Sequence, residues 1–222
     1  MFLGHYAVAL AAKRAAPATS LGTLFFASVF VDLLWPLLLL AGVERARVDA
    51  NIRGLGPLVF EHYPVSHSLL MVGVWALLLG VACFAVTRDR RGALVVATLV
   101  VSHWLLDALS HRPDLLLVPG GAMRIGLGLW NAPVASAVAE LGLFAGGLLL
   151  YARATRGQRR WPLWALCALL LAIFVGDLVG PPPPSITAVA WVGLAQLLLV
   201  AAGWWIDRRG IPPLAAIRPA NQ

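Results

Sequence analysis

Six long apolar stretches constrain the fold of this chain more than any other feature of its sequence. A helix of about 20 apolar residues is long enough to cross the hydrocarbon core of a membrane. The stretches cover residues 21–43, 66–87, 92–110, 133–152, 161–180 and 186–206. The sequence therefore predicts an all-α integral membrane bundle with six transmembrane helices.

The composition agrees with a membrane protein and leaves one shorter apolar segment to place. The 222 residues are 60% hydrophobic and only 12% charged, which is more apolar surface than a soluble domain of this size could bury. Residues 2–12 are apolar but too short to span alone, so we predict a half-membrane or interfacial helix there. We expect a single membrane domain over residues 1–222, with the polar site in residues 1–132 and three further helices in residues 133–222.

Lysine and arginine are divided unevenly between the two ends of the predicted helices. Twelve of the seventeen basic residues lie in segments that share a side with residues 13–20, and five lie on the opposite side. Because cytoplasmic loops carry an excess of basic residues, we expect the side with residues 13–20 and the C-terminus to be cytoplasmic. The net charge of +7 is spread over short loops, so we expect no nucleic-acid partner.

Acidic residues occur inside the predicted spans without any lysine or arginine to neutralise them. There are four: Asp32, Asp107, Glu140 and Asp177. Charged side chains are costly in a bilayer and usually mark a functional site. Ionised carboxylates would also repel one another. A bound divalent cation would supply the missing positive charge.

Histidines accompany these acids in the spans and at their outer ends. His103, Asp107 and His111 follow one another at four-residue intervals, so their side chains share one helix face. The rise of a helix places most of the acids and histidines in the outer half of the bilayer, where they could converge. An imidazole and a carboxylate one turn apart can bind one divalent cation. We therefore expect one zinc-like ion to be held by His5, Asp32, His67, His103 and Asp107.

Further histidines and acids could transfer a proton or orient these ligands. His62 lies in an extended stretch and could be a ligand or a proton acceptor, and Glu140 could also accept a proton. Glu140 and Asp177 could instead orient the histidines or form hydrogen bonds in the core. His111 could orient a ligand, contact a substrate, or only complement the dipole at the outer end of its helix.

Two long outer loops, residues 44–65 and 111–132, show no clear secondary structure, and such loops are often functional. In the second loop, Arg112 and Arg124 could receive a phosphate headgroup or extend toward the membrane interface. Trp130 and Asn131 close the same loop. They could contact a substrate, although an interfacial tryptophan could equally anchor the protein in the membrane.

Four separated sequence elements contain these candidate ligands. They are Gly4–His5, Asp32 in FVDLLW, the stretch HYPVSHS from His62 to Ser68, and SHWLLD with His103 and Asp107. Together they resemble a bacterial family usually called membrane-bound metal-dependent hydrolases, inner-membrane proteins distantly similar to zinc-dependent phospholipase C. That family has an early G-H, an aspartate late in the next apolar segment, an H-x4-H-S element and an S-H-x3-D helix. The resemblance covers residues 1–132 and implies zinc-dependent hydrolysis in the inner membrane.

The expected function is metal-dependent hydrolysis of a membrane lipid or another small amphiphile that reaches the site from the outer leaflet. The ion would acidify a water molecule and polarise the scissile phosphoryl or acyl oxygen. One alternative is a transporter of metal ions, or one coupled to protons, that uses the same groups. Another is a non-catalytic scaffold whose histidine and aspartate network fixes helix packing. The cytoplasmic halves of the spans carry few polar residues, which favours a one-sided enzyme pocket.

Overall fold

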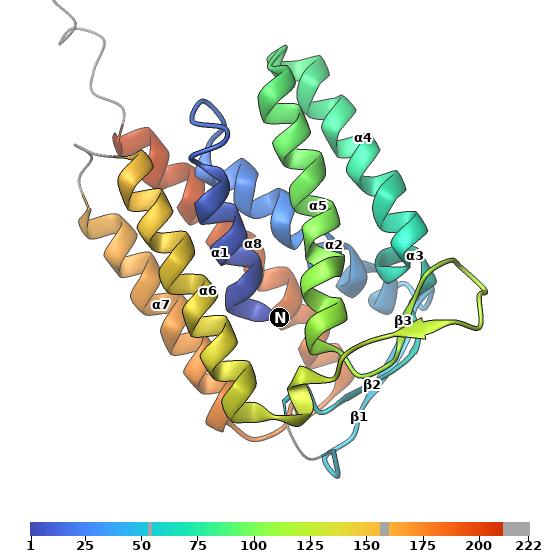
Figure 1. Cartoon of the computed structure of the whole chain (residues 1–222). Helices are drawn as coiled ribbons and strands as arrows, with labels where there is room; N and C mark the ends of the chain where they lie inside the picture. Colours follow the sequence, from blue (N-terminus) through green and yellow to red (C-terminus); the bar gives the residue numbers. More distant parts are fainter. Residues whose placement is uncertain (53–54, 156–159, 211–222) are drawn as a thin grey trace, which may run out of the picture.

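The computed structural model describes residues 1–52, 55–155 and 160–210, and it confirms the all-α membrane bundle (Figure 1). Six helices of the described chain are long and apolar enough to cross a membrane. They are α2 (Leu21–Leu40), α4 (Leu69–Thr87), α5 (Arg90–Ser110), α6 (Pro133–Ala154), α7 (Trp161–Val179) and α8 (Ile186–Gly210). Their positions follow the six apolar stretches because bilayer-length hydrophobic runs form helices.

The short helix α1 (Phe2–Ala12) lies inside the bundle, against α2, α5 and α6 (Figure 1). Leu3, Tyr6 and Leu10 are fully buried, so α1 is not an interfacial helix. A side chain at Gly147 of α6 would collide with the backbone of Ala7, and glycine there lets the two helices pack in direct contact. The first residues of the chain therefore lie in the middle of the bundle.

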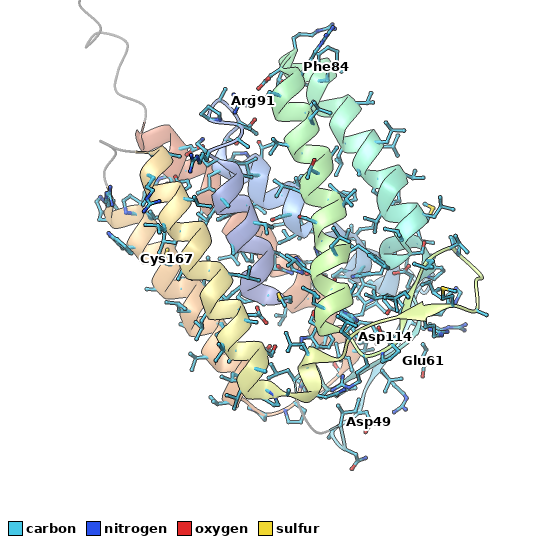
Figure 2. All side chains as sticks on the ribbon, viewed as in Figure 1. Asp49, Glu61, Phe84, Arg91, Asp114 and Cys167 are labelled. Carbon is cyan, nitrogen blue, oxygen red and sulfur yellow. The ribbon has the colours of Figure 1, made fainter. Side chains whose placement is uncertain are left out.

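The loops gather at two opposite ends of the bundle. Residues 13–20, the α4–α5 turn near Arg91 and the end of α6 lie at one end (Figures 1 and 2). The other end, where Asp49 and Glu61 protrude, has two small antiparallel hairpins (Figure 2). One pairs β1 (Arg45–Val48) with β2 (Leu58–His62), and the other pairs β3 (Leu115–Leu116) with β4 (Arg124–Ile125).

These hairpins correct the expectation that residues 44–65 and 111–132 lack clear secondary structure. The strands are too short to show a hydrophobic alternation, and the register of the first hairpin shifts between Arg45 and Ala46. The loops also contain the single turn α3 (Pro64–His67) and the short 3-10 helix η1 (Leu129–Asn131). Of the basic residues behind the predicted orientation, Arg53, Arg156, Arg159 and Arg218 lie outside the described residues.

A buried ion pair joins three helix termini at the end of the bundle away from the hairpins. Lys13 Nζ lies 2.8 Å from Asp207 Oδ2, and their side chains are only 9% and 11% exposed. Lys13 also donates to the carbonyl of Thr19, and the backbone N–H of Leu21 donates to Asp207. The pair therefore connects the end of α1, the start of α2 and the end of α8.

Replacing Lys13 with methionine should destabilise the protein strongly, because it leaves the Asp207 carboxylate buried without a cationic partner. We expect the free energy of unfolding in detergent to fall by about 3–5 kcal/mol. The exposed pair of Arg47 and Asp49 offers a matched control, since Arg47→Met should cost less than about 1 kcal/mol. Equal effects of the two substitutions would contradict a stabilising role for the buried pair.

Candidate metal centre

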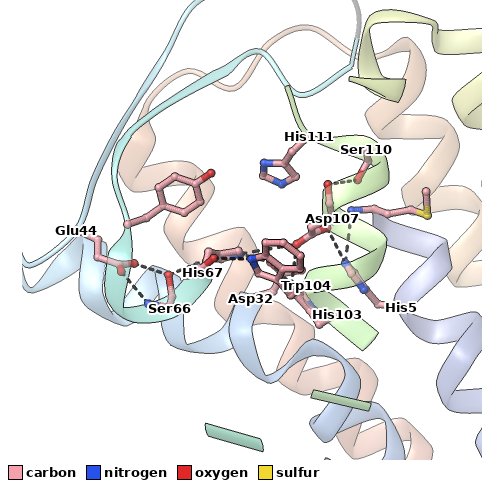
Figure 3. Close-up of polar contacts among 12 residues, drawn as sticks. His5, Asp32, Glu44, Ser66, His67, His103, Trp104, Asp107, Ser110 and His111 are labelled. Atoms are coloured by element: carbon pink, nitrogen blue, oxygen red, sulfur yellow. Dashed lines mark hydrogen bonds and ion pairs between the residues drawn. The ribbon is translucent and has the colours of Figure 1, made fainter. Parts of the chain in front are cut away.

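Four polar side chains from α2, α3 and α5 converge in the interior of the bundle (Figure 3). Each offers one ligand atom, and the four atoms all lie within 4.8 Å of one another. We call this set the His/Asp cluster: Asp32, His67, His103 and Asp107. These residues come from separate stretches of the sequence, and the fold brings them together.

The distances within the His/Asp cluster suit a small cation. His103 Nε2 lies 3.0 Å from Asp107 Oδ2 and 3.5 Å from Asp32 Oδ1. His67 Nε2 lies 3.7 Å from Asp32 Oδ1 and 3.9 Å from Asp107 Oδ2. Neighbouring ligand atoms of a tetrahedral zinc ion with bonds of about 2.1 Å are about 3.4 Å apart. The observed separations lie on both sides of that value.

Nε2 of His103 is a buried polar atom without a hydrogen bond in the described chain, despite its closeness to Asp107. Its other ring nitrogen, Nδ1, lies 2.7 Å from the backbone carbonyl of Ser28. A carbonyl oxygen only accepts, so Nδ1 carries a proton and Nε2 of the neutral ring presents a lone pair to the cluster. An unused lone pair that faces two carboxylates is what a cation site requires.

His5 lies beside the His/Asp cluster and not among its four converging atoms. Its Nε2 is 3.2 Å from Oδ1 of Asp107, whereas His103 lies near the other carboxylate oxygen, Oδ2. The amino group of Met1 also donates to Oδ1 of Asp107, at 2.8 Å, and forms an ion pair with it. The His5 ring stacks flat on His103, with 3.8 Å between ring centroids. The structure therefore brings together four of the five predicted ligands and places the fifth in contact with two of them.

A cavity of about 170 Å³ opens onto the cluster from the hairpin end of the bundle. Its polar wall combines cluster residues with two further acids, Glu140 and Asp177. Its apolar wall is largely aromatic and includes Phe2, Trp35, Phe60 and Trp130. The cavity thus offers one surface to a polar group and another to an apolar one.

Comparison with known proteins assigns this arrangement to a family. The model of the YdjM inner membrane protein family matches residues 1–180, which include the whole His/Asp cluster. The chain belongs to the YdjM inner membrane protein family. With six long apolar helices, it is a multi-pass protein of the bacterial inner membrane. No curated protein and no solved structure matches the chain.

The two predicted proton acceptors take different positions in this YdjM family member. His62 is exposed at the end of β2 and is not among the residues that line the cavity. Glu140 is buried and lines the cavity, but its Oε2 accepts hydrogen bonds from the backbone N–H groups of Leu3 and Gly4. Glu140 therefore holds the start of α1. Asp177 faces the cavity from α7 and is exposed.

His111 lines the cavity and belongs to a hydrogen-bonded chain of its own. Its Nδ1 lies 3.0 Å from Asp114 Oδ1, and the Tyr63 hydroxyl donates to the same oxygen at 2.7 Å. Burial, together with the neighbouring Asp114 carboxylate, raises the pKa of Tyr63 well above its usual range. Tyr63 is therefore a donor at neutral pH. The His111 ring packs against Trp130, with 4.2 Å between ring centroids.

The two arginines of the second loop bind protein groups and do not line the cavity. Arg112 donates from Nε to Asn131 Oδ1 at 2.9 Å. Its other two nitrogens each donate over 3.1 Å to the carbonyls of Gly56 and Leu55. Arg124 donates to the carbonyl of Asp114. These contacts connect the hairpin-end loops to one another, and Asn131 takes part through Arg112.

The sequence did not indicate the groups that contact the Nδ1 atoms of the two cluster histidines. The carbonyl of Ser28 accepts from His103, and the hydroxyl of Ser66 lies 2.7 Å from His67 Nδ1. Behind Ser66 lies Glu44, which is 1% exposed. Glu44 follows an apolar run and precedes Arg45, so it resembles an ordinary loop charge. The available signal was an acid within a few residues of a predicted span.

Replacing Asp32 with asparagine should weaken zinc binding by at least about 100-fold, because it removes an anionic ligand atom from the His/Asp cluster. Isothermal titration of metal-free protein in detergent should give one zinc site per wild-type chain. The matched control is Glu61→Gln, which removes an exposed acid on β2 and should leave the affinity unchanged. Wild-type protein without zinc affinity would contradict the assignment of this cluster as a metal centre.

Proposed function

We propose that this protein is a zinc-dependent hydrolase that acts on a lipid or another amphiphile within the inner membrane. The observation that carries the proposal is the fully buried Nε2 of His103, which makes no hydrogen bond and faces Asp32 and Asp107, two residues that line the cavity. Two neutral imidazoles and two carboxylates match both the ligand types and the charge of a divalent zinc ion.

Asp32, His67, His103 and Asp107 would hold the ion, and His5 would orient Asp107 through its Oδ1. When bound, a divalent cation supplies positive charge that polarises a phosphoryl or acyl oxygen and makes water more acidic. The walls of the cavity then orient the substrate. A polar group would face the acids, and the apolar remainder would lie against the aromatic side chains of Trp35 and Phe60.

We infer that His111 accepts the proton, in place of His62 or Glu140. His111 lines the cavity, whereas His62 is exposed and Glu140 already accepts two backbone hydrogen bonds. The Asp114 carboxylate accepts the Nδ1 proton of His111, which leaves Nε2 of the neutral ring as a proton acceptor. This pairing of imidazole with carboxylate also orients the ring.

The orientation that we propose has the hairpins and the cavity at the outer face and the C-terminus in the cytoplasm. The excess of basic residues on the side of residues 13–20 supports it. A membrane-impermeant maleimide added to intact spheroplasts should then label a Met123→Cys variant but not an Arg91→Cys variant. The opposite labelling would overturn this orientation.

A transporter would use the same cluster but would need access from both ends of the bundle. Between the cluster and the opposite end of the bundle, the space beside α1 is filled by the fully buried side chains of Tyr6 and Leu10. The Lys13–Asp207 pair lies beyond them. The residues that line the cavity belong to the cluster and to the hairpin end of the bundle, and Tyr6, Leu10 and Lys13 are not among them. This one-sided access favours an enzyme.

Purified zinc-loaded protein in detergent should release product from at least one member of a panel of phospholipids and acyl amphiphiles. Asp32→Asn should lower turnover to background, and His111→Gln should lower it by about 10²–10⁴-fold because the proton acceptor is lost. The control Glu61→Gln should match wild type. Metal binding without turnover of any amphiphile would favour the transporter, and the absence of both would favour the scaffold.

A further inference from the structure

Glu44 is a fully buried acid whose two carboxylate oxygens are both occupied by donors from α3. Oε1 accepts from the backbone N–H groups of Val65 and Ser66, each at 2.8 Å. Oε2 accepts from the Ser66 hydroxyl at 2.6 Å (Figure 3). Burying a carboxylate is costly, and three donors on its two oxygens offset that cost. The loop after α2 is therefore connected to the helical turn that ends at His67.

The contact between Ser66 and His67 has a fixed direction because of Glu44. An ionised carboxylate only accepts hydrogen bonds, so the single hydroxyl proton of Ser66 is directed to Glu44. Ser66 Oγ, which lies 2.7 Å from His67 Nδ1, can then only accept from that nitrogen. Nδ1 of the neutral imidazole must carry the proton. Nε2 is left with a lone pair, directed at Asp32 and Asp107.

We propose that Glu44, acting through Ser66, is a positioning residue that fixes the tautomer of His67 so that its Nε2 can bind a metal ion. The inference rests on the metal centre described under the proposed function. His103 reaches the same tautomer by another route, because its Nδ1 donates to the backbone carbonyl of Ser28. No side-chain substitution removes that carbonyl. The two cluster histidines therefore differ in their dependence on Glu44.

Replacing Glu44 with glutamine should reverse the direction of the hydrogen bonds that link residue 44, Ser66 and His67. The backbone N–H groups of Val65 and Ser66 require the glutamine oxygen as their acceptor, which turns its NH2 group toward Ser66 Oγ. The Ser66 hydroxyl then accepts from glutamine and donates to His67 Nδ1. The proton of the neutral His67 ring moves to Nε2, where it blocks the lone pair that faces the cluster.

The test measures the two ring 15N shifts of each histidine in metal-free, full-length protein in detergent. The pH is raised until the shifts of His67 stop moving, so that this ring is neutral. Wild-type His67 should have its proton on Nδ1, and Glu44→Gln should move it to Nε2. His103 should keep its proton on Nδ1 in both proteins. Zinc affinity of Glu44→Gln should fall by about 10- to 100-fold, as expected for a group that orients a ligand.

The matched control is Glu61→Gln, a neighbouring acid in β2 that should change neither the tautomer nor the affinity. If Glu44→Gln does not fold, Ser66→Ala replaces it, since Glu44 keeps both backbone donors there. His67 should then populate both tautomers. A His67 proton that stays fully on Nδ1 in the folded variant would overturn the proposal.

The two proposals can fail separately, because the tautomer is read without metal. Wild-type protein that shows the predicted tautomers but binds no zinc would retain the role of Glu44 and reject the metal-dependent function. Zinc binding by wild type together with unchanged affinity and tautomer in Glu44→Gln would reject only the role of Glu44.

Discussion

Two carboxylates, Asp32 and Asp107, lie together with two imidazoles in the His/Asp cluster inside a membrane bundle. The function of this protein depends on what neutralises their charge. In the described part of the chain no lysine or arginine side chain pairs with either carboxylate. Asp107 has the amino group of Met1 at 2.8 Å from its Oδ1, and the ion pairs of Asp32 are with histidines alone. Asp107 is buried and Asp32 is 31% exposed, and positive charge between these two carboxylates would relieve their mutual repulsion. The two imidazoles can supply it only if protonated, whereas a divalent cation supplies it and also uses the buried Nε2 of His103.

Most of the surrounding structure serves to hold these four side chains in place. Glu140 anchors the start of α1, which brings His5 to Oδ1 of Asp107. The Ser28 carbonyl orients His103 from α2, and Glu44 acts on His67 from the loop after that helix. Arg112 joins the loops over the cavity. Such support reduces the reorganisation that metal binding would require.

Local sequence patterns predicted the spans and much of the cluster, because both depend on short-range regularities. Helical spacing alone places His103 and Asp107 on one face, and depth along the helix places Asp32 near them. The roles of Glu44 and His111 could not be predicted in the same way. Glu44 binds α3 across 21 residues of sequence and looks like a loop charge until the turn at Pro64 is placed. The sequence favoured His62 over His111 as the proton acceptor, and only the folded hairpin shows that His62 is exposed while His111 lines the cavity.

The most direct test of the central claim is X-ray absorption at the zinc edge of wild-type protein that has been loaded with zinc and freed of excess metal. The account predicts one ion per chain with four nitrogen or oxygen neighbours at about 2.0 Å and outer scattering from two imidazoles. Asp32→Asn should weaken or abolish this signal. Protein that retains no zinc, or zinc whose spectrum lacks imidazole scattering, would contradict a metal centre built from Asp32, His67, His103 and Asp107.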